Sequence, residues 1–241
     1  MSALPGVKAL VFDTFGTVVD WRGGIARDAR TFLARHGRAD VDPHGFADAW
    51  RKRYQPAMEE VRSGRRPFTR LDVLHRENLD LVLRDHGLDP DALPADDLDW
   101  LNRAWHRLDP WPDAIPGLLR LKARYFIGPL SNGNILLLAN MAKRAGIPWD
   151  AILGAEPARA YKPQPEAYTR TAEILGLAPG EVALVAAHNG DLAAARDAGL
   201  ATAFVLRPHE HGPGQRTDTR AESDWGASVN SFEELADRLG C

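Results

Sequence analysis

Cysteine is almost absent from this sequence, because the only one is the last residue, Cys241. A single thiol excludes an intrachain disulfide and any zinc site built on three or four cysteines. A reducing cytoplasm is therefore the expected location. Long apolar runs are also missing, and none approaches the roughly 18 residues that a membrane span requires. The opening residues, Met-Ser-Ala-Leu-Pro-Gly, lack the basic start and apolar core of a secretory signal, so we expect no such signal.

Neither sign of charge dominates, because 33 acidic and 30 basic residues leave a formal net charge of −3. This balance gives no reason to expect nucleic acid or an anionic membrane as a partner. Hydrophobic residues make up 44% of the 241 positions, which is ordinary for a globular protein. A chain of this length can form one sizeable core, or a core with a small accessory domain.

An apolar run that ends in a carboxylate stands near the start of the chain. Lys8-Ala9-Leu10-Val11-Phe12 precedes Asp13, and Gly16 then turns the chain. This pattern predicts a buried strand that presents one reactive group at its carboxyl end, where ligands bind in open parallel sheets.

The next stretch, from about residue 23 to 108, has few β-branched apolar runs and repeated helical spacing. Four helical faces are predicted: Phe32, Leu33 and His36; Phe46, Trp50, Tyr54 and Met58; Leu71, Leu74, Leu79, Leu81 and Leu83; Leu98, Leu101 and Trp105. We therefore expect a helical cap domain, residues 21–108, inserted into a core domain formed by residues 1–20 and 109–241.

Strand and helix patterns alternate from Pro112 onward, which indicates parallel βαβ units covered on both faces. The expected strands are 125–130, 151–153, 182–186 and 203–206. The expected helices are 116–122, 135–145, 165–175, 192–198 and 231–239, the last with Ser231 and Glu234 spaced as a capping box. Residues 207–224 are predicted to form a surface loop. The fold class is thus α/β, with a Rossmann-like, mostly parallel sheet.

Polar residues follow each predicted strand end, and the carboxyl ends of parallel strands meet at one edge of a sheet. Taken singly they are weak signals, because such a carboxylate can cap a helix, Ser-Asn-Gly can be a turn and a lysine can be solvated. Together they predict an active site. The residues are Asp13 and Thr17, then Ser131-Asn132-Gly133, then Tyr161-Lys162-Pro163, then His188-Asn189-Gly190-Asp191.

These strand-end residues resemble the four motifs of the haloacid dehalogenase superfamily. Most members of that superfamily are magnesium-dependent phosphatases whose first motif reads Asp-x-Asp, and the second acid protonates the leaving alkoxide. Phe15 stands at that second position here. A halide leaves without such a proton, fluoride least clearly so, and an aromatic ring removes a carboxylate that would help to hold magnesium. This departure favours carbon–halogen cleavage over phosphatase chemistry.

Closer still, the chain resembles the type II (S)-2-haloacid dehalogenases over nearly its whole length. The matching features are Phe-Asp-x-Phe-Gly-Thr, Trp50-Arg51, Ser131-Asn132-Gly133, and Tyr161-Lys162-Pro163 with Tyr168 six residues beyond the lysine. By this resemblance Asp13 is the nucleophile, Thr17 orients it, Lys162 balances the negative charge, and Asp191 holds Lys162 and the hydrolytic water. Physical reasoning agrees, because a buried carboxylate needs a nearby cation to stay ionised.

The resemblance also implies a set of substrate-binding residues. Arg51 would reach from the cap to the leaving halide, and Ser131 and Asn132 would receive the substrate carboxylate, partly through backbone N–H groups. Tyr168 and Phe15 would shape the pocket. Cations and oriented amides are needed because an anionic substrate must approach an anionic nucleophile. Without the resemblance, Arg51 would be read as a surface arginine paired with Glu59 or Asp48, and Tyr168 as helix packing.

One motif departs from the type II pattern, which often reads Ser-Ser-Asn-x-x-Asp at the fourth strand end. This chain reads Ala186-Ala187-His188-Asn189-Gly190-Asp191, so His188 takes the asparagine position. We hypothesise that His188 supplies a polar contact near the nucleophile or on the halide side. The alternative is that it caps the following helix.

The activity that the resemblance implies is hydrolytic dehalogenation of short (S)-2-haloalkanoic acids to 2-hydroxy acids through an aspartyl ester, with haloacetates and fluoroacetate as further candidates. No metal or organic cofactor is implied, and the partners would be the haloacid and the halide ion. A homodimer is allowed by the resemblance. Two alternatives stay open: a phosphatase or phosphonate hydrolase on the same fold, and a non-catalytic binding protein on this scaffold.

Overall fold

The computed structural model describes residues 4–241. Within this range a six-stranded sheet has the strand order β5-β4-β1-β6-β7-β8, and every neighbouring pair is parallel. A short antiparallel pair, β2-β3, stands apart. The α/β prediction with a mostly parallel sheet is confirmed. The strands are β1 (Ala9–Phe12), β2 (Val19–Asp20), β3 (Asp109–Pro110), β4 (Phe126–Ser131), β5 (Leu153–Gly154), β6 (Val182–Ala186), β7 (Ala201–Val205) and β8 (Ala227–Val229).

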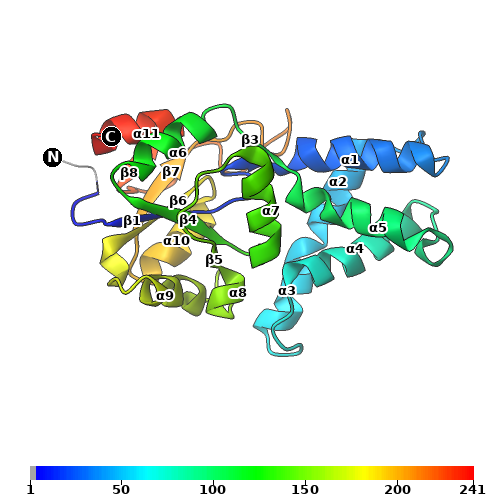
Figure 1. The fold of residues 1–241 in the computed structure, drawn as a ribbon, viewed down its shortest axis with the longest axis horizontal. Helices are drawn as coiled ribbons and strands as arrows, with labels where there is room; N and C mark the ends of the chain where they lie inside the picture. Colours follow the sequence, from blue (N-terminus) through cyan, green and yellow to red (C-terminus); the bar gives the residue numbers. More distant parts are fainter. Residues whose placement is uncertain (1–3) are drawn as a thin grey trace.

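Helices cover both faces of this sheet, with α6 and α11 along one side and α9 and α10 along the other (Figure 1). The core helices are α6 (Ala114–Lys122), α7 (Ile135–Ala145), α8 (Ala155–Ala158), α9 (Pro165–Ile174), α10 (Asn189–Asp197) and α11 (Phe232–Leu239), with a 3₁₀ turn η3 (Pro179–Glu181). Successive β1 residues face opposite sides, as the period of a strand requires. Leu10 and Phe12 therefore pack in one apolar cluster with Phe232, whereas Ala9 and Val11 belong to a second cluster with other residues.

Strand β1 is central, because it pairs with β4 on one side and β6 on the other. The N–H of Asp13 extends the ladder by donating to the carbonyl of Val185 at 3.0 Å. Asp13 is therefore held at the carboxyl edge of the sheet by the strands around it. Strand β5 is shifted from the predicted 151–153. Its Gly154 has φ +112°, and a Cβ there would lie 2.3 Å from the backbone oxygen of Ser131, so the close pairing with β4 requires glycine.

The segment between β2 and β3 is helical and lies beside the sheet rather than on either face (Figure 1). Its elements are α1 (Trp21–Arg35), α2 (Pro43–Lys52), α3 (Tyr54–Arg62), α4 (Leu71–Asp85), η1 (Pro90–Ala92), α5 (Ala95–Asn102) and η2 (Arg103–His106). The second predicted face is divided between α2 and α3, and Trp105 lies in a 3₁₀ turn. The prediction that Leu81 packs with the other leucines of α4 is wrong. Leu81 is 44% exposed, because it lies two residues from Leu79 and Leu83 and so on the opposite side of the helix.

Residues 207–224 are not simply a surface loop, and that prediction is wrong for two of them. Arg207 and Glu210 are buried at 6% and 1% exposure. Arg207 donates to Asp113 at 2.7 Å and to the carbonyl of Thr17 at 2.9 Å, which ties the loop to the first strand–turn segment. The loop is thereby held against the carboxyl edge of the sheet.

The predicted capping box is only half formed. Ser231 accepts from the N–H of Glu234 at 3.0 Å, but the Glu234 carboxylate accepts from Asn230 instead of returning to Ser231. Within residues 4–241, no helix has both the length and the apolar character needed to cross a membrane. The expectation about a secretory signal involves residues 1–3, which lie outside the described residues.

Candidate active site

A cavity of ≈ 570 Å³ lies where the helical segment meets the carboxyl edge of the sheet. The sheet contributes the residues after its strand ends, α2 and α3 contribute the opposite side, and residues 207–224 contribute a third. Its lining residues are Asp13, Phe15, Arg51, Tyr54, Gln55, Arg62, Asn132, Lys162, Pro163, Tyr168, His188, Gly190, Asp191, Glu210, His211 and Asp218. Side chains predicted from four separate strand ends therefore meet in one place.

Asp13 is buried at 7% exposure, with both carboxylate oxygens hydrogen-bonded. Lys162 donates to Oδ1 at 2.9 Å, and Thr17 donates to Oδ2 at 2.7 Å. His188 Nδ1 lies 3.1 Å from the same Oδ2. Burial alone would raise the pKa of Asp13, but the charges and hydrogen bonds of Lys162 and His188 hold that pKa well below its usual range. The result is an ionised carboxylate that is largely withdrawn from water.

Lys162 bridges two carboxylates, because its Nζ also donates to Asp191. Burial opposes its charge, yet Asp13 and Asp191 together raise the pKa of Lys162 above its ordinary value. Its backbone N–H donates to the side chain of Asn132 at 2.8 Å, which fixes the loop that carries it. Tyr168 is buried and donates its hydroxyl to Asp191 at 2.6 Å, so it does more than pack its helix.

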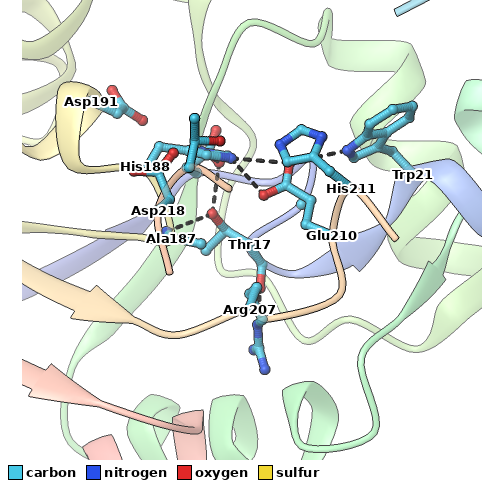
Figure 2. Close-up of polar contacts among 12 residues, drawn as sticks. Thr17, Trp21, Ala187, His188, Asp191, Arg207, Glu210, His211 and Asp218 are labelled. Atoms are coloured by element: carbon cyan, nitrogen blue, oxygen red, sulfur yellow. Dashed lines mark hydrogen bonds and ion pairs between the residues drawn. The ribbon is translucent and has the colours of Figure 1, made fainter. Parts of the chain in front are cut away.

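His188 and Glu210 form a second charged pair at this site, which Figure 2 shows beside Thr17 and Trp21. Nε2 of His188 is 2.9 Å from Glu210 Oε2, and the indole N–H of Trp21 donates to Glu210 Oε1 at 3.0 Å. Burial would lower the pKa of His188, but the carboxylates of Glu210 and Asp13 raise it well above its ordinary value. His188 occupies the cap position of α10, but within residues 4–241 its side chain makes no capping hydrogen bond.

Glu210 and Trp21 are site residues that sequence reasoning missed. Glu210 lies in a stretch rich in Pro, Gly and His, which reads as solvated loop, and Trp21 reads as helix packing. The nearest hint in the sequence is Gly16 itself, which the structure shows with φ +89° and with Glu210 Oε1 only 2.0 Å from where its Cβ would lie. The turn after Asp13 thus needs glycine for two reasons: its left-handed backbone and the buried carboxylate against it.

Arg51 faces the aromatic side of the cavity. Its guanidinium carbon lies 4.0 Å from the Tyr54 ring centre, 5.4 Å from Trp21 and 6.0 Å from Phe15. Its Nη1 is buried and has no hydrogen-bond partner among residues 4–241. The surface pairing considered from sequence does not form, because Asp48 pairs with Arg22 and Glu59 pairs with Arg62. A buried, unpaired N–H group of a cation is suited to bind an anion.

Phe15 and Ser131 complete the set of predicted residues. Phe15 is 2% exposed and packs edge-on against Trp105 at 5.5 Å and Tyr54 at 6.5 Å, so the aromatic wall begins two residues after Asp13. The Ser131 hydroxyl accepts from the N–H of Gly133 at 3.1 Å, and among the described residues Ser131 does not line the cavity. Its side chain orders the turn that carries Asn132.

Comparison with known proteins places this architecture in a family. The model of the haloacid dehalogenase-like hydrolases matches residues 7–199. The (S)-2-haloacid dehalogenase of Xanthobacter autotrophicus is 32% identical over 203 residues, which are 83% of this chain and 76% of that protein. The (S)-2-haloacid dehalogenase 4A of Burkholderia cepacia is 30% identical over 83% of this chain and 84% of its own length.

Solved structures agree over nearly the whole chain. The defluorinating L-2-haloacid dehalogenase Rha0230 is 57% identical, with a TM-score of 0.96 and coverage of 98% of both chains. The L-2-haloacid dehalogenase of Xanthobacter autotrophicus with covalently bound chloropropionic acid has a TM-score of 0.77 at 25% identity, covering 96% of this chain and 97% of its own. This chain therefore belongs to the haloacid dehalogenase-like hydrolases and, within them, to the family of the (S)-2-haloacid dehalogenases.

Proposed function

We propose that this protein hydrolyses the carbon–halogen bond of short (S)-2-haloalkanoic acids and releases 2-hydroxy acids. The observation that carries the proposal is the state of Asp13, a buried ionised carboxylate held between Lys162 and Thr17. Arg51, with its unpaired Nη1, lies on the other side of the same cavity. A nucleophile and an anion-binding cation across one small space suit a displacement in which halide departs.

In the first step a carboxylate oxygen of Asp13 attacks C2 from the side opposite the halide. A C2–oxygen bond forms while the carbon–halogen bond breaks, and the electron pair leaves with the halide toward Arg51. The substrate carboxylate would lie near Asn132 and the backbone N–H groups of its turn. The product is an ester of Asp13, with the configuration at C2 inverted.

In the second step water attacks the ester carbonyl carbon of Asp13. Asp191 acts as the general base for this water, because its carboxylate lines the cavity and is held in place by Lys162 and Tyr168. The attacking water passes one proton to Asp191, and that proton moves to the departing alkoxide as the ester bond breaks. The regenerated carboxylic acid of Asp13 then ionises and releases a proton to solvent.

We include fluorinated substrates such as fluoroacetate in this proposal. The support is the 57% identity to a dehalogenase described as defluorinating. Residues 21–108 would act as the cap domain over residues 1–20 and 109–241, because α2 and α3 supply Arg51 and Tyr54 to the cavity.

The proposal is tested by a halide-release assay with fluoro-, chloro- and bromoacetate and with both enantiomers of 2-chloropropionate, with and without chelator. We expect release from the (S) enantiomer and from the haloacetates, and none in Asp13→Asn. Single turnover in oxygen-18 water should leave the first product unlabelled, since its new oxygen comes from Asp13. Immediate label in the product, or magnesium-dependent release of phosphate from an aryl phosphate in place of halide release, would contradict the proposal.

A further inference from the structure

His188 lies between two carboxylates, and each ring nitrogen faces one of them. Figure 2 shows the side of the ring that faces Glu210. Nδ1 is 3.1 Å from Oδ2 of Asp13, and Nε2 is 3.0 Å and 2.9 Å from the two oxygens of Glu210. A neutral imidazole has a single N–H, so only the doubly protonated ring can donate to both partners. His188 is therefore an imidazolium whose charge is balanced by the Glu210 carboxylate, with its second N–H directed at Asp13.

The two oxygens of Asp13 are not equivalent. Oδ2 accepts a hydrogen bond from Thr17 and forms an ion pair with His188 Nδ1 at 3.1 Å, whereas Oδ1 accepts from Lys162. Attack on a substrate carbon needs a lone pair that no donor occupies, and Oδ1 has fewer donors. Oδ1 is thus the better nucleophile, and Oδ2 becomes the carbonyl oxygen of the ester.

We propose that His188, with Thr17, forms a charged oxyanion hole at Oδ2 for hydrolysis of the aspartyl ester, and that Glu210 is the positioning residue that keeps it protonated. The proposal rests on the proposed function. When water attacks Cγ, its oxygen forms a new bond and the carbonyl pair moves onto Oδ2. Collapse restores the carbonyl and breaks the Cγ–Oδ1 bond, so that Oδ1 leaves with the hydroxy acid.

The contact between His188 and Oδ2 strengthens during this second step. In the ester Oδ2 carries no formal charge, whereas in the tetrahedral intermediate it carries a full negative charge beside the imidazolium. An interaction that grows toward the transition state accelerates the step. The same contact stabilises the ionised nucleophile before the first step, so it gives no advantage to alkylation.

Rapid-quench kinetics with (S)-2-chloropropionate separates the two steps. We expect His188→Asn, which keeps a donor but loses the charge, to slow ester hydrolysis about tenfold. His188→Leu removes the donor, and we expect a loss of roughly 10²- to 10³-fold. Both variants should release halide in a burst of about one equivalent per site at the wild-type rate or faster, and intact-mass measurement should show the ester on Asp13 accumulating.

The pH dependence of ester hydrolysis gives a readout that a merely structural role would not move. The charged or titratable groups around His188 are Asp13, Glu210, His211, Lys162, Asp191, Arg51 and Asp218, the last of which accepts from the backbone N–H of Asn189. Deprotonation of the imidazolium should produce an alkaline fall in the wild-type rate. Glu210→Gln should move this fall to lower pH, and His188→Asn should abolish it. His209→Asn, an exposed histidine next to Glu210 in sequence, is the matched control and should behave as wild type.

Two outcomes overturn the inference. One is a His188→Asn variant whose halide release is slowed while no ester accumulates, because His188 would then serve alkylation. The other is unchanged hydrolysis with an unchanged pH profile in both His188→Asn and Glu210→Gln, each verified as folded by its thermal unfolding. Failure of the proposed function looks different, since the wild-type protein itself would then release no halide from any haloacid.

Discussion

Two regions at the cavity differ in what surrounds their buried charges. The charged floor, formed by Asp13, Lys162, His188, Asp191 and Glu210, pairs ionised groups with one another. The aromatic wall surrounds the cation Arg51 with rings: Phe15 and Tyr54 line the cavity, and Trp21, His75 and Trp105 pack around them and the guanidinium.

Two buried histidines show the difference most clearly. His188 in the floor is flanked by carboxylates, which raise its pKa. His75 in the wall is stacked on Trp105 at 4.2 Å, and neither ring nitrogen has a hydrogen-bond partner within residues 4–241. Burial there lowers the pKa of His75 to about 3. Burial alone therefore does not decide the charge of a histidine, because the groups that face it do.

Removing the cation of the floor should have the largest effect. Lys162→Met leaves Asp13 and Asp191 buried without their shared partner. Breaking such a buried pair lowers the free energy of unfolding by about 3–5 kcal/mol. We expect kcat/KM for halide release to fall about 10²- to 10³-fold, because a preorganised charge beside the nucleophile is lost. The lowered pKa of Asp13 favours its ionised form above that pKa, so without Lys162 the pKa rises and the acid limb of the pH–rate profile should move to higher pH.

The matched control for Lys162 is Lys122→Met, which removes a half-exposed lysine paired with Asp150 at 2.6 Å. This variant should keep the wild-type rate and pH profile. An acid limb at the same pH in Lys162→Met and the wild type would show that the floor does not depend on this lysine for its ionisation.

Removing the cation of the wall should have a smaller effect, felt mainly in activity. Arg51→Met deletes a buried N–H that has no hydrogen-bond partner among residues 4–241, but it also takes the cation from its three rings, so the free energy of unfolding should change by no more than about 2 kcal/mol. We expect kcat/KM to drop about 10²-fold, because the departing halide loses its charged donor. The control is Arg53→Met, which breaks only an exposed pair with Asp85. Equal activity losses in the two variants would contradict this role.

Most residues of the charged floor could be predicted from the sequence more readily than those of the aromatic wall, because they follow strand ends. Strand 182–186 was predicted at its observed bounds, and parallel strands bring Asp13, Lys162 and Asp191 to one edge whatever the detail of the loops. The pairing of Asp13 with Lys162 spans 149 positions, yet the topology implies it.

The part that could not be predicted depends on contacts without a local pattern. Glu210 is 189 positions from Trp21, and a lone acid in a loop carries no periodic signal of burial. The break between α2 and α3 likewise has no local signal, because apolar residues recur every four positions on both sides of it. The break depends on packing against the rest of the proposed cap. Asn78 donates to the carbonyl of Arg53 at 3.2 Å, at the position where the two helices separate. Such partners are set by the assembled structure.

The neutral state of His75 should make the protein less stable in acid, by about 2 kcal/mol in the free energy of unfolding at pH 5. Its folded pKa of about 3 lies below the ordinary value of 6.5, so its contribution is present above pH 6.5 and is lost as the pH falls toward 3. At pH 5 this loss is about 2 kcal/mol. His75→Phe keeps the stacking on Trp105 and should gain about that much stability relative to wild type at pH 5 compared with pH 8, measured by denaturant unfolding. The same difference at both pH values would show that His75 is not the titrating group.

Trp21 joins the two regions, and cutting its link should have the smallest effect. Trp21→Phe keeps an aromatic ring against Trp105 but removes the N–H that donates to Glu210. Glu210 retains His188, so we expect a loss of about 1 kcal/mol, or roughly fivefold, in ester hydrolysis, with alkylation unchanged. Trp149→Phe, whose ring packs on Phe12 away from the cavity, is the control. If Trp21→Phe slows ester hydrolysis less than Glu210→Gln does, Trp21 acts through Glu210 and the floor. If it slows ester hydrolysis more, Trp21 acts instead on Arg51 through the wall.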